Sequence, residues 1–140
     1  MLPKCFVFTV IGLLATVTLA HSGLAGDKKD PDKKPLTPIE ARKQIGKKIT
    51  VEMTVKASKN ALSKRGEIYL DSEENFRDEN NFAVVITKKG AASLEADGIY
   101  DPAGHFLNKA IRANGTVKEV DNIPRIEIDD AKQIRLAKDK

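Results

Sequence analysis

Side chains able to do covalent or metal chemistry are scarce in this sequence. It has a single cysteine, Cys5, two histidines and no tryptophan among its 140 residues. A disulfide within the chain needs a second cysteine, and a zinc site is built mainly from several Cys and His ligands. A glycine-rich phosphate-binding loop is also missing. We therefore expect no disulfide, no bound metal, no cofactor and no catalytic residues, and hence a protein that is not an enzyme.

A strong excess of one charge is lacking too. The chain carries 24 basic and 20 acidic residues, a net charge of +4. So mild a bias is typical of a charged surface that keeps a protein in solution, and alone it does not indicate a polyanionic partner. Aromatic residues make up only 5% of the chain, which limits its capacity to stack on nucleic-acid bases.

The longest apolar run stands at the start of the chain, in MLPKCFVFTVIGLLATVTLA. A lysine near the front, the apolar stretch and the small residues Thr18 and Ala20 are the parts of a secretory signal peptide. We expect a signal peptide over residues 1–25, cut between residues 20 and 26. The mature chain would then be periplasmic or secreted, with no stable membrane insertion. An amino-terminal membrane anchor is the alternative, because the run approaches the roughly 18 residues that a spanning helix needs.

The next segment changes from a linker to a helix. Residues 26–36 are expected to be a flexible charged linker, because GDKKDPDKKP contains no apolar residue. Thr37 and Glu40 then have the spacing of a capping box around Pro38, and Gly46 is a helix stop. This pattern predicts a short helix from Pro38 to about Ile45.

After Gly46 the apolar period changes to two, which indicates strands. Gly115 stands inside one of them, where a glycine marks a bulge or a close approach. We expect a helix around residues 91–96, between the third and fourth strands. The five predicted strands cover about residues 48–58, 67–71, 82–87, 110–120 and 125–137, the last with a break near residues 129–132.

This order of elements predicts a mainly β fold, a five-stranded OB-fold Greek-key barrel with a helix between strands three and four and a short amino-terminal helix. An α+β sandwich is the structural alternative. The segments GKKITVEMTV, IYLDSEENFRDENNFAVVI and KAIRANGTVKEVDNIPRIEIDDAKQI resemble bacterial OB-fold domains grouped with nucleic-acid-binding, tRNA-anticodon-type OB modules. The resemblance spans about Gly46 to Leu136, and it implies an OB domain over residues 37–138.

The acidic centre between the second and third predicted strands is a candidate metal site. A calcium loop would need a glycine at its sixth position, where counting from Asp71 gives Phe76. We therefore predict a turn, with Phe76 folding the loop back onto apolar surface. The alternative is a nuclease-like site, which would use Asp71, Glu73, Arg77 and Asp78. Whether the acidic connection over residues 71–79 binds a divalent ion is left open.

Ligands of OB-folds usually bind across the second and third strands, between the loops that join strands one to two and four to five. Tyr69 faces away from Ile68 and Leu70, and is the best candidate stacking ring. The predicted ligand-binding residues are Tyr69 and four basic residues of the two loops: Lys59, Lys64 and Arg65 in the first loop, and Arg125, beside Pro124, in the second. We expect Lys64, Arg65, Tyr69 and Arg125 to line one surface. The ligand would be single-stranded nucleic acid or another oligomer. The alternative is an exported protein- or small-ligand-binding module that uses the same cleft or an exposed edge strand.

Overall fold

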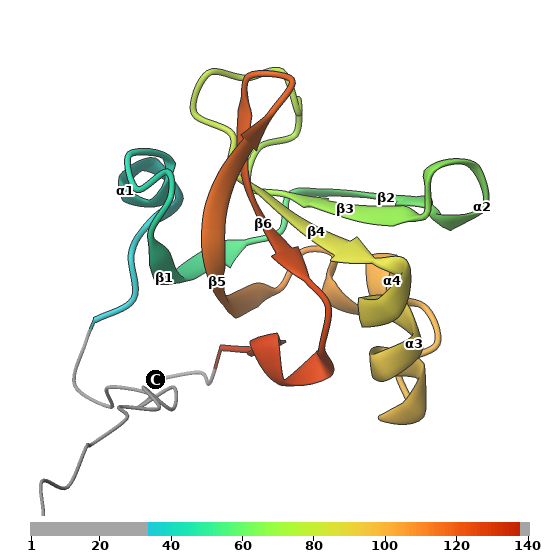
Figure 1. Ribbon diagram of the computed structural model, residues 1–140. Coiled ribbons are helices and arrows are strands. Elements are labelled where there is room, and N and C mark those ends of the chain that lie inside the picture. Colours follow the sequence, from blue (N-terminus) through green and yellow to red (C-terminus); the bar gives the residue numbers. More distant parts are fainter. Residues whose placement is uncertain (1–33, 138–140) are drawn as a thin grey trace, which may run out of the picture. The chain divides into compact units, whose positions relative to one another are not determined.

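The structure is a computed structural model that describes residues 34–137 (Figure 1). The predicted signal peptide and residues 26–33 of the predicted linker lie outside the described residues. None of the helices within residues 34–137 is long and apolar enough to cross a membrane.

The described residues form a mainly β fold with one mixed sheet. Its strands follow the order β1-β5-β6-β4-β3-β2, and β7 pairs with β5 off this path. All pairs are antiparallel except β4 and β6, which run parallel. The strands are β1 (Lys48–Thr54), β2 (Ala57–Ala61), β3 (Glu67–Asp71), β4 (Ala83–Thr87), β5 (Ala110–Val120), β6 (Ile123–Ile128) and β7 (Ile134–Leu136).

The arrangement is OB-like, as expected, but the predicted strand count is wrong. Residues 34–137 form seven strands instead of five, and β1 and β2 end the path without pairing with each other. The first predicted strand is divided into β1 and β2, because the backbone changes its partner strand between Val55 and Lys56. Val55 N–H donates to the Lys109 carbonyl beside β5, whereas Lys56 N–H donates to the Asp71 carbonyl of β3. β1 therefore belongs to one side of the sheet and β2 to the other.

The last predicted strand divides at the break that the sequence indicated. A 3-10 helix, η1 (Ala131–Gln133), separates β6 from β7. Asp130 and Gln133 cap this turn reciprocally, because the Asp130 side chain accepts from the Lys132 N–H and the Gln133 side chain accepts from the Asp130 N–H. Capping residues thus end β6 and restart the chain as β7.

The core lies on one face of the strands, where alternate apolar residues point inward. β1, β3, β4, β5 and β6 all contribute side chains to it, and the two helices between β4 and β5 add Leu94 and Phe106. The largest fully buried side chains are Phe82, Phe106, Ile68, Leu70, Ile86, Leu94, Ile111, Ile126, Ile128, Val51, Val55 and Val84.

Four helices accompany the strands in the described part of the chain: α1 (Pro38–Arg42), α2 (Leu62–Arg65), α3 (Lys88–Ala96) and α4 (Pro102–Phe106). The capping box of α1 is present, with the Thr37 N–H donating to Glu40 Oε2 at 2.8 Å. The helix is shorter than predicted, because it is capped at Lys43. Helices α3 and α4 confirm the helical connection predicted between the third and fourth predicted strands, which are β4 and β5 of the structure.

Close backbone approaches explain two glycines. A Cβ on Gly115 of β5 would lie 2.7 Å from Ile126 Cγ2 of β6, so the sequence signal for a close approach at Gly115 is confirmed. A Cβ on Gly90 of α3 would lie 2.0 Å from the carbonyl oxygen of Ile128, closer than atoms can pack. Gly90 therefore allows α3 to rest against the end of β6.

Candidate ligand-binding face

The face of β3 that points away from the core carries Glu67 and Tyr69, because these residues alternate with Ile68 and Leu70 of the core. Register places Lys59 of β2 opposite Tyr69 on one side and Val85 of β4 opposite it on the other. Cross-strand partners share a face of the sheet. We call this the outer face; it continues across β6 and into the second half of β5.

A hydrogen-bonded network of alternating charges crosses the outer face. The Tyr69 hydroxyl donates to Glu67 Oε2 at 2.6 Å, and Arg125 Nη2 donates to Glu67 Oε1 at 3.3 Å. Arg125 Nη2 also lies 2.6 Å from Glu127 Oε1, and Lys118 Nζ lies 2.7 Å from Glu127 Oε2. The network joins β3, β6 and β5, so it holds the Tyr69 ring in a defined position on the sheet.

The network is partly buried. The Arg125 side chain is only 12% exposed, and its Nε is buried with no hydrogen-bond partner in the described structure. Val85 is 0% exposed although its register places it on the outer face, opposite Tyr69. Removing one member of such a pair is costly, because it leaves the remaining charge buried and unpaired.

The surroundings shift two pKa values on this face. Hydrogen bonding from Lys118, together with Arg125, lowers the pKa of Glu127, so this carboxylate stays ionised. Burial raises the pKa of Tyr69, the hydrogen bond with Glu67 adds to the rise, and hydrogen bonding to Arg65 opposes it. Tyr69 is therefore a neutral phenol whose hydroxyl donates a hydrogen bond to the Glu67 carboxylate.

The structure places the predicted ligand residues differently from the sequence interpretation. Lys59 lies in strand β2 and Arg125 in strand β6, whereas both were expected in loops. Lys64 and Arg65 belong to helix α2, which leads from β2 to β3. Tyr69 lies on the outer face, as predicted.

Some of these residues are brought together and some are not. Tyr69 and Arg125 meet through a shared partner, Glu67, and Arg65 lies near enough to Tyr69 to oppose the rise of its pKa. Lys64 is exposed, and within residues 34–137 its side chain has no bond to the others. Sequence reasoning missed Glu67 and Glu127, although both alternate with core residues in the strands that carry Tyr69 and Arg125.

The acidic connection between β3 and β4 is built around Asn81, not Phe76. Asn81 is 0% exposed, and its Nδ2 donates to Asp71 Oδ1 at 3.0 Å and to the Phe76 carbonyl at 3.1 Å. Its Oδ1 accepts from the Glu73 N–H at 3.1 Å. Phe76 itself is 50% exposed beneath the guanidinium of Arg77. The prediction that Phe76 anchors this loop is therefore wrong.

Burial of the Asp71 carboxyl raises its pKa, and the hydrogen bond from Asn81 opposes the rise. Asp71 is 7% exposed and its Oδ1 is already bonded to the Asn81 amide, so little of this carboxyl is accessible to a ligand. Within residues 34–137, no three or more His, Cys, Asp or Glu side chains are grouped so that they could hold a metal ion.

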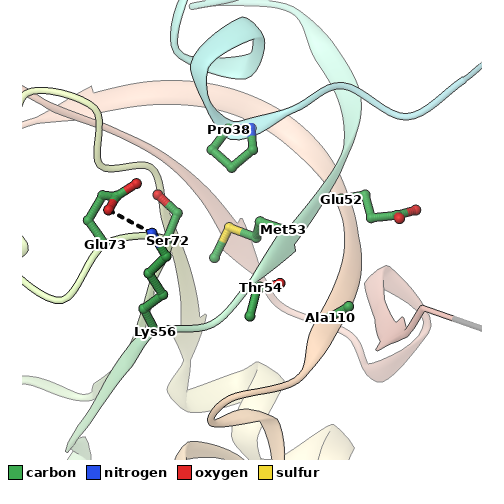
Figure 2. A pocket seen from close by; sticks show the side chains of 8 residues that line it. All are labelled: Pro38, Glu52, Met53, Thr54, Lys56, Ser72, Glu73 and Ala110. Atoms are coloured by element: carbon green, nitrogen blue, oxygen red, sulfur yellow. Dashed lines mark hydrogen bonds and ion pairs between the residues drawn. The ribbon is translucent and has the colours of Figure 1, made fainter. Parts of the chain in front are cut away.

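A groove of about 310 Å³ lies elsewhere, between α1, β1 and the start of the acidic connection (Figure 2). Met53 lies centrally in it, and Lys56 forms an ion pair with Glu73 at 3.0 Å on one side (Figure 2). Arg42 Nη1 donates to the Asn81 carbonyl, which ties α1 to the acidic connection. The residues lining the groove are Pro38, Glu52, Met53, Thr54, Lys56, Ser72, Glu73 and Ala110.

Comparison with known proteins identifies relatives by structure alone. No protein-family model matches the chain, and none of the curated proteins matches it. One similar solved structure is an asparaginyl-tRNA synthetase from Pyrococcus horikoshii, at 12% identity and a TM-score of 0.50, covering 74% of this chain and 23% of the synthetase. Another is OBody AM1L10 bound to hen egg-white lysozyme, at 12% identity and a TM-score of 0.50, covering 76% of this chain and 96% of the OBody. This chain thus spans about a quarter of the synthetase, and what the two likenesses establish is its OB-like fold.

Proposed function

We propose that this chain is an exported, non-enzymatic binding module that holds single-stranded nucleic acid on the outer face of β3 and β4. The observation that carries the proposal is the Tyr69 ring, fixed on the sheet through Glu67 and bordered by the basic residues Lys59, Arg65 and Arg125. The asparaginyl-tRNA synthetase with the same fold is named for a nucleic acid, which supports this ligand class.

The chemistry of the face suits a base and its phosphates. A base stacked on an aromatic ring contributes roughly 1–3 kcal/mol, and stacking tolerates any base sequence. Arg125 is engaged with Glu67 and Glu127, so its role is to position the network. Lys59 and Lys64 are exposed and have no ion-pair partner in the described part of the chain, so they are the groups that meet phosphates.

Export is supported by the amino-terminal sequence, in which a lysine, an apolar run and small residues follow one another. A non-enzymatic role is supported by the residue types, since thiols and imidazoles are nearly absent from the chain. Export and the absence of enzyme activity are tested separately from ligand binding. Sequencing the amino terminus of the exported protein tests export. Incubating the protein with oligonucleotides and divalent ions tests whether it cleaves them, and we expect no cleavage.

The binding test is a fluorescence-anisotropy titration of a labelled 12-nucleotide oligo-dT. We expect saturable binding that weakens as salt rises, because binding releases counterions from the phosphates. Tyr69→Ala should weaken binding about tenfold, the equivalent of roughly 1.4 kcal/mol of stacking. Tyr69→Phe keeps the aromatic ring, so it should lose much less affinity for the oligonucleotide than Tyr69→Ala.

The matched control is Tyr100→Ala. Tyr100 is 78% exposed in the connection between α3 and α4, so it is as able as any tyrosine to stack adventitiously. If Tyr100→Ala weakens binding as much as Tyr69→Ala does, the outer face is not the site. Absence of binding at low salt would contradict the nucleic-acid proposal as a whole.

The groove beside Met53 favours a second candidate function, binding of a small ligand or of a protein side chain. Its volume of about 310 Å³ is near the lower end of the range for ligand pockets. The OBody that shares this fold is described in complex with lysozyme, which shows that an OB-type scaffold can hold a protein. Binding that is insensitive to salt and abolished by Thr54→Trp, which places a large side chain at an exposed position lining the groove, would favour this function over the first.

A further inference from the structure

Strand β2 ends the path of strands and pairs only with β3 (Figure 1). Within residues 34–137, no other strand pairs with its second edge. Alternate residues of a strand direct their N–H and C=O groups to opposite edges, so β2 presents unpaired backbone donors and acceptors on its open side.

Within the described residues, the helix that packs against β2 lies on its inner face. Helix α4 packs against both β2 and β3, and Ser58 Oγ donates to the Ala103 carbonyl at 2.9 Å. Ser58 is the register partner of Leu70, a core residue, so its side chain points to the inner face. Helix α4 therefore lies on the inner face of the pair of strands, and Lys59 and Asn60 of β2 remain exposed.

The residues of β2 and α2 next to this edge, which we call the cationic margin, carry positive charge only. The segment from Ala57 to Gly66 contains Lys59, Lys64 and Arg65 and no acidic residue. Lys59 and Lys64 are exposed, and neither has an ion-pair partner among the described residues. A partner strand laid along β2 would therefore be favoured if it carried carboxylates.

The same charge opposes pairing of β2 with a second copy of itself. In an antiparallel pair centred on Lys59, the two ammonium groups would lie directly opposite each other, which is destabilising. A carboxylate at the opposite position turns that repulsion into attraction. Charge complementarity thus selects an acidic partner over self-association.

We propose that the open edge of β2 binds an extended acidic peptide by strand addition, with Lys59 and Lys64 pairing with its carboxylates. Backbone hydrogen bonds along the edge would supply affinity, and the alternate side chains of the peptide would supply specificity. This site shares Lys59 and Lys64 with the nucleic-acid site proposed above, and it differs from that site in using the backbone edge of β2 in place of the Tyr69 ring.

The test is a titration of the protein with a fluorescein-labelled octapeptide of alternating Glu and Thr. Two further peptides carry N-methyl groups on one or the other alternating set of amides, which removes donors without changing charge. We expect the parent to bind, one methylated peptide to bind at least about tenfold more weakly, and the other to bind like the parent, because only one set of amides faces β2.

Variants locate the site. Lys59→Glu should weaken binding of the peptide about fivefold. Lys132→Glu makes the same change of net charge on an exposed residue of η1, and should leave binding unchanged. Amide hydrogen exchange should slow at alternate residues of β2 when the parent peptide binds.

Three results would overturn the proposal. If both methylated peptides bind like the parent, only charge attraction is at work. If exchange in β2 is unaffected, the peptide binds elsewhere. If only oligo-dT binds, the cationic margin serves nucleic acid alone. Failure of the nucleic-acid proposal has a different signature, since it would appear in the oligo-dT titration while the peptide titrations remained as expected.

Discussion

At the scale of single residues, Asn81 shows how one buried amide organises a long polar connection. Its side chain bonds to Asp71, to the Phe76 carbonyl and to the Glu73 N–H, and its own carbonyl accepts from Arg42. The sequence offered no direct signal for this role, because Asn75, Asn80 and Asn81 look equivalent. Only the fold decides which of the three is buried.

Asn81→Ala should destabilise the fold by about 2 to 3 kcal/mol, because it leaves the buried Asp71 carboxyl and a backbone carbonyl without their donors. The measurement is the urea concentration at the unfolding midpoint. Asn80→Ala is the matched control, since Asn80 is exposed and only its backbone N–H is bonded. Equal destabilisation by the two variants would show that Asn81 is not the anchor.

Glu127 gives the stability of the protein a definite dependence on pH. Its folded-state pKa is lowered by Lys118 and Arg125, so its contribution is present above the unfolded pKa and is lost as pH falls through the folded pKa. Glu127→Gln should therefore lower the free energy of unfolding at pH 7. It should have little effect once the pH lies below the pKa of Glu127 in both the folded and the unfolded state. Urea unfolding of the two proteins from pH 7 down to pH 3 checks this. A difference between them that stays constant with pH would contradict the ion-pair account.

Asp71 works in the opposite direction, which separates the two groups experimentally. Burial raises its folded-state pKa, so its favourable contribution is present below the unfolded pKa and is lost as pH rises through the folded pKa. A titration of both carboxyls by NMR should therefore find the pKa of Asp71 above, and that of Glu127 below, the ordinary value for its residue type.

At the scale of elements, the sequence predicted those segments whose signals are local. Strands β3 and β5 match the predicted ranges, and the capping box at Thr37 is present. Alternation and capping depend on a few neighbouring residues, so they can be predicted from the sequence without knowing the tertiary fold. Helix α2 was missed, because a single helical turn in a polar hairpin has no apolar period.

The displacement of Arg125 from loop to strand has a specific cause. Asp121 and Asn122 adopt positive φ values of 53° and 64°, so two residues complete the turn between β5 and β6. Pro124 then falls inside β6, although a proline suggested a loop from the sequence. Where a turn ends depends on its backbone dihedral angles, and the sequence pattern did not determine these.

Gly90→Ala tests the packing of α3 against β6. Alanine in place of glycine inside a helix ordinarily stabilises a protein by up to about 1 kcal/mol. Here the new Cβ would meet the Ile128 carbonyl, so we expect destabilisation by about 1 to 3 kcal/mol in thermal or urea unfolding. Lys89→Ala, at the exposed neighbouring position, should have little effect. A stabilised Gly90→Ala variant would mean that α3 does not rest on the end of β6.

At the scale of the whole domain, the sheet leaves two different surfaces for ligands. The outer face carries a fixed ring inside a network whose charges are largely paired, and the edge of β2 carries unpaired backbone groups with free lysines. Sequence reasoning found Tyr69 and the basic residues near it. It did not find the carboxylates that hold them, because pairing across β3, β6 and β5 depends on strand order.

The most direct test of the central claim is a map of amide chemical-shift changes in the isotope-labelled protein as unlabelled oligo-dT is added. The proposal predicts that the changes concentrate on the outer face, at Lys59, Tyr69 and Val85 and in β6 around Arg125, and fade as salt is raised. Changes confined to the groove beside Met53, or none at all at low salt, would contradict nucleic-acid binding by the outer face.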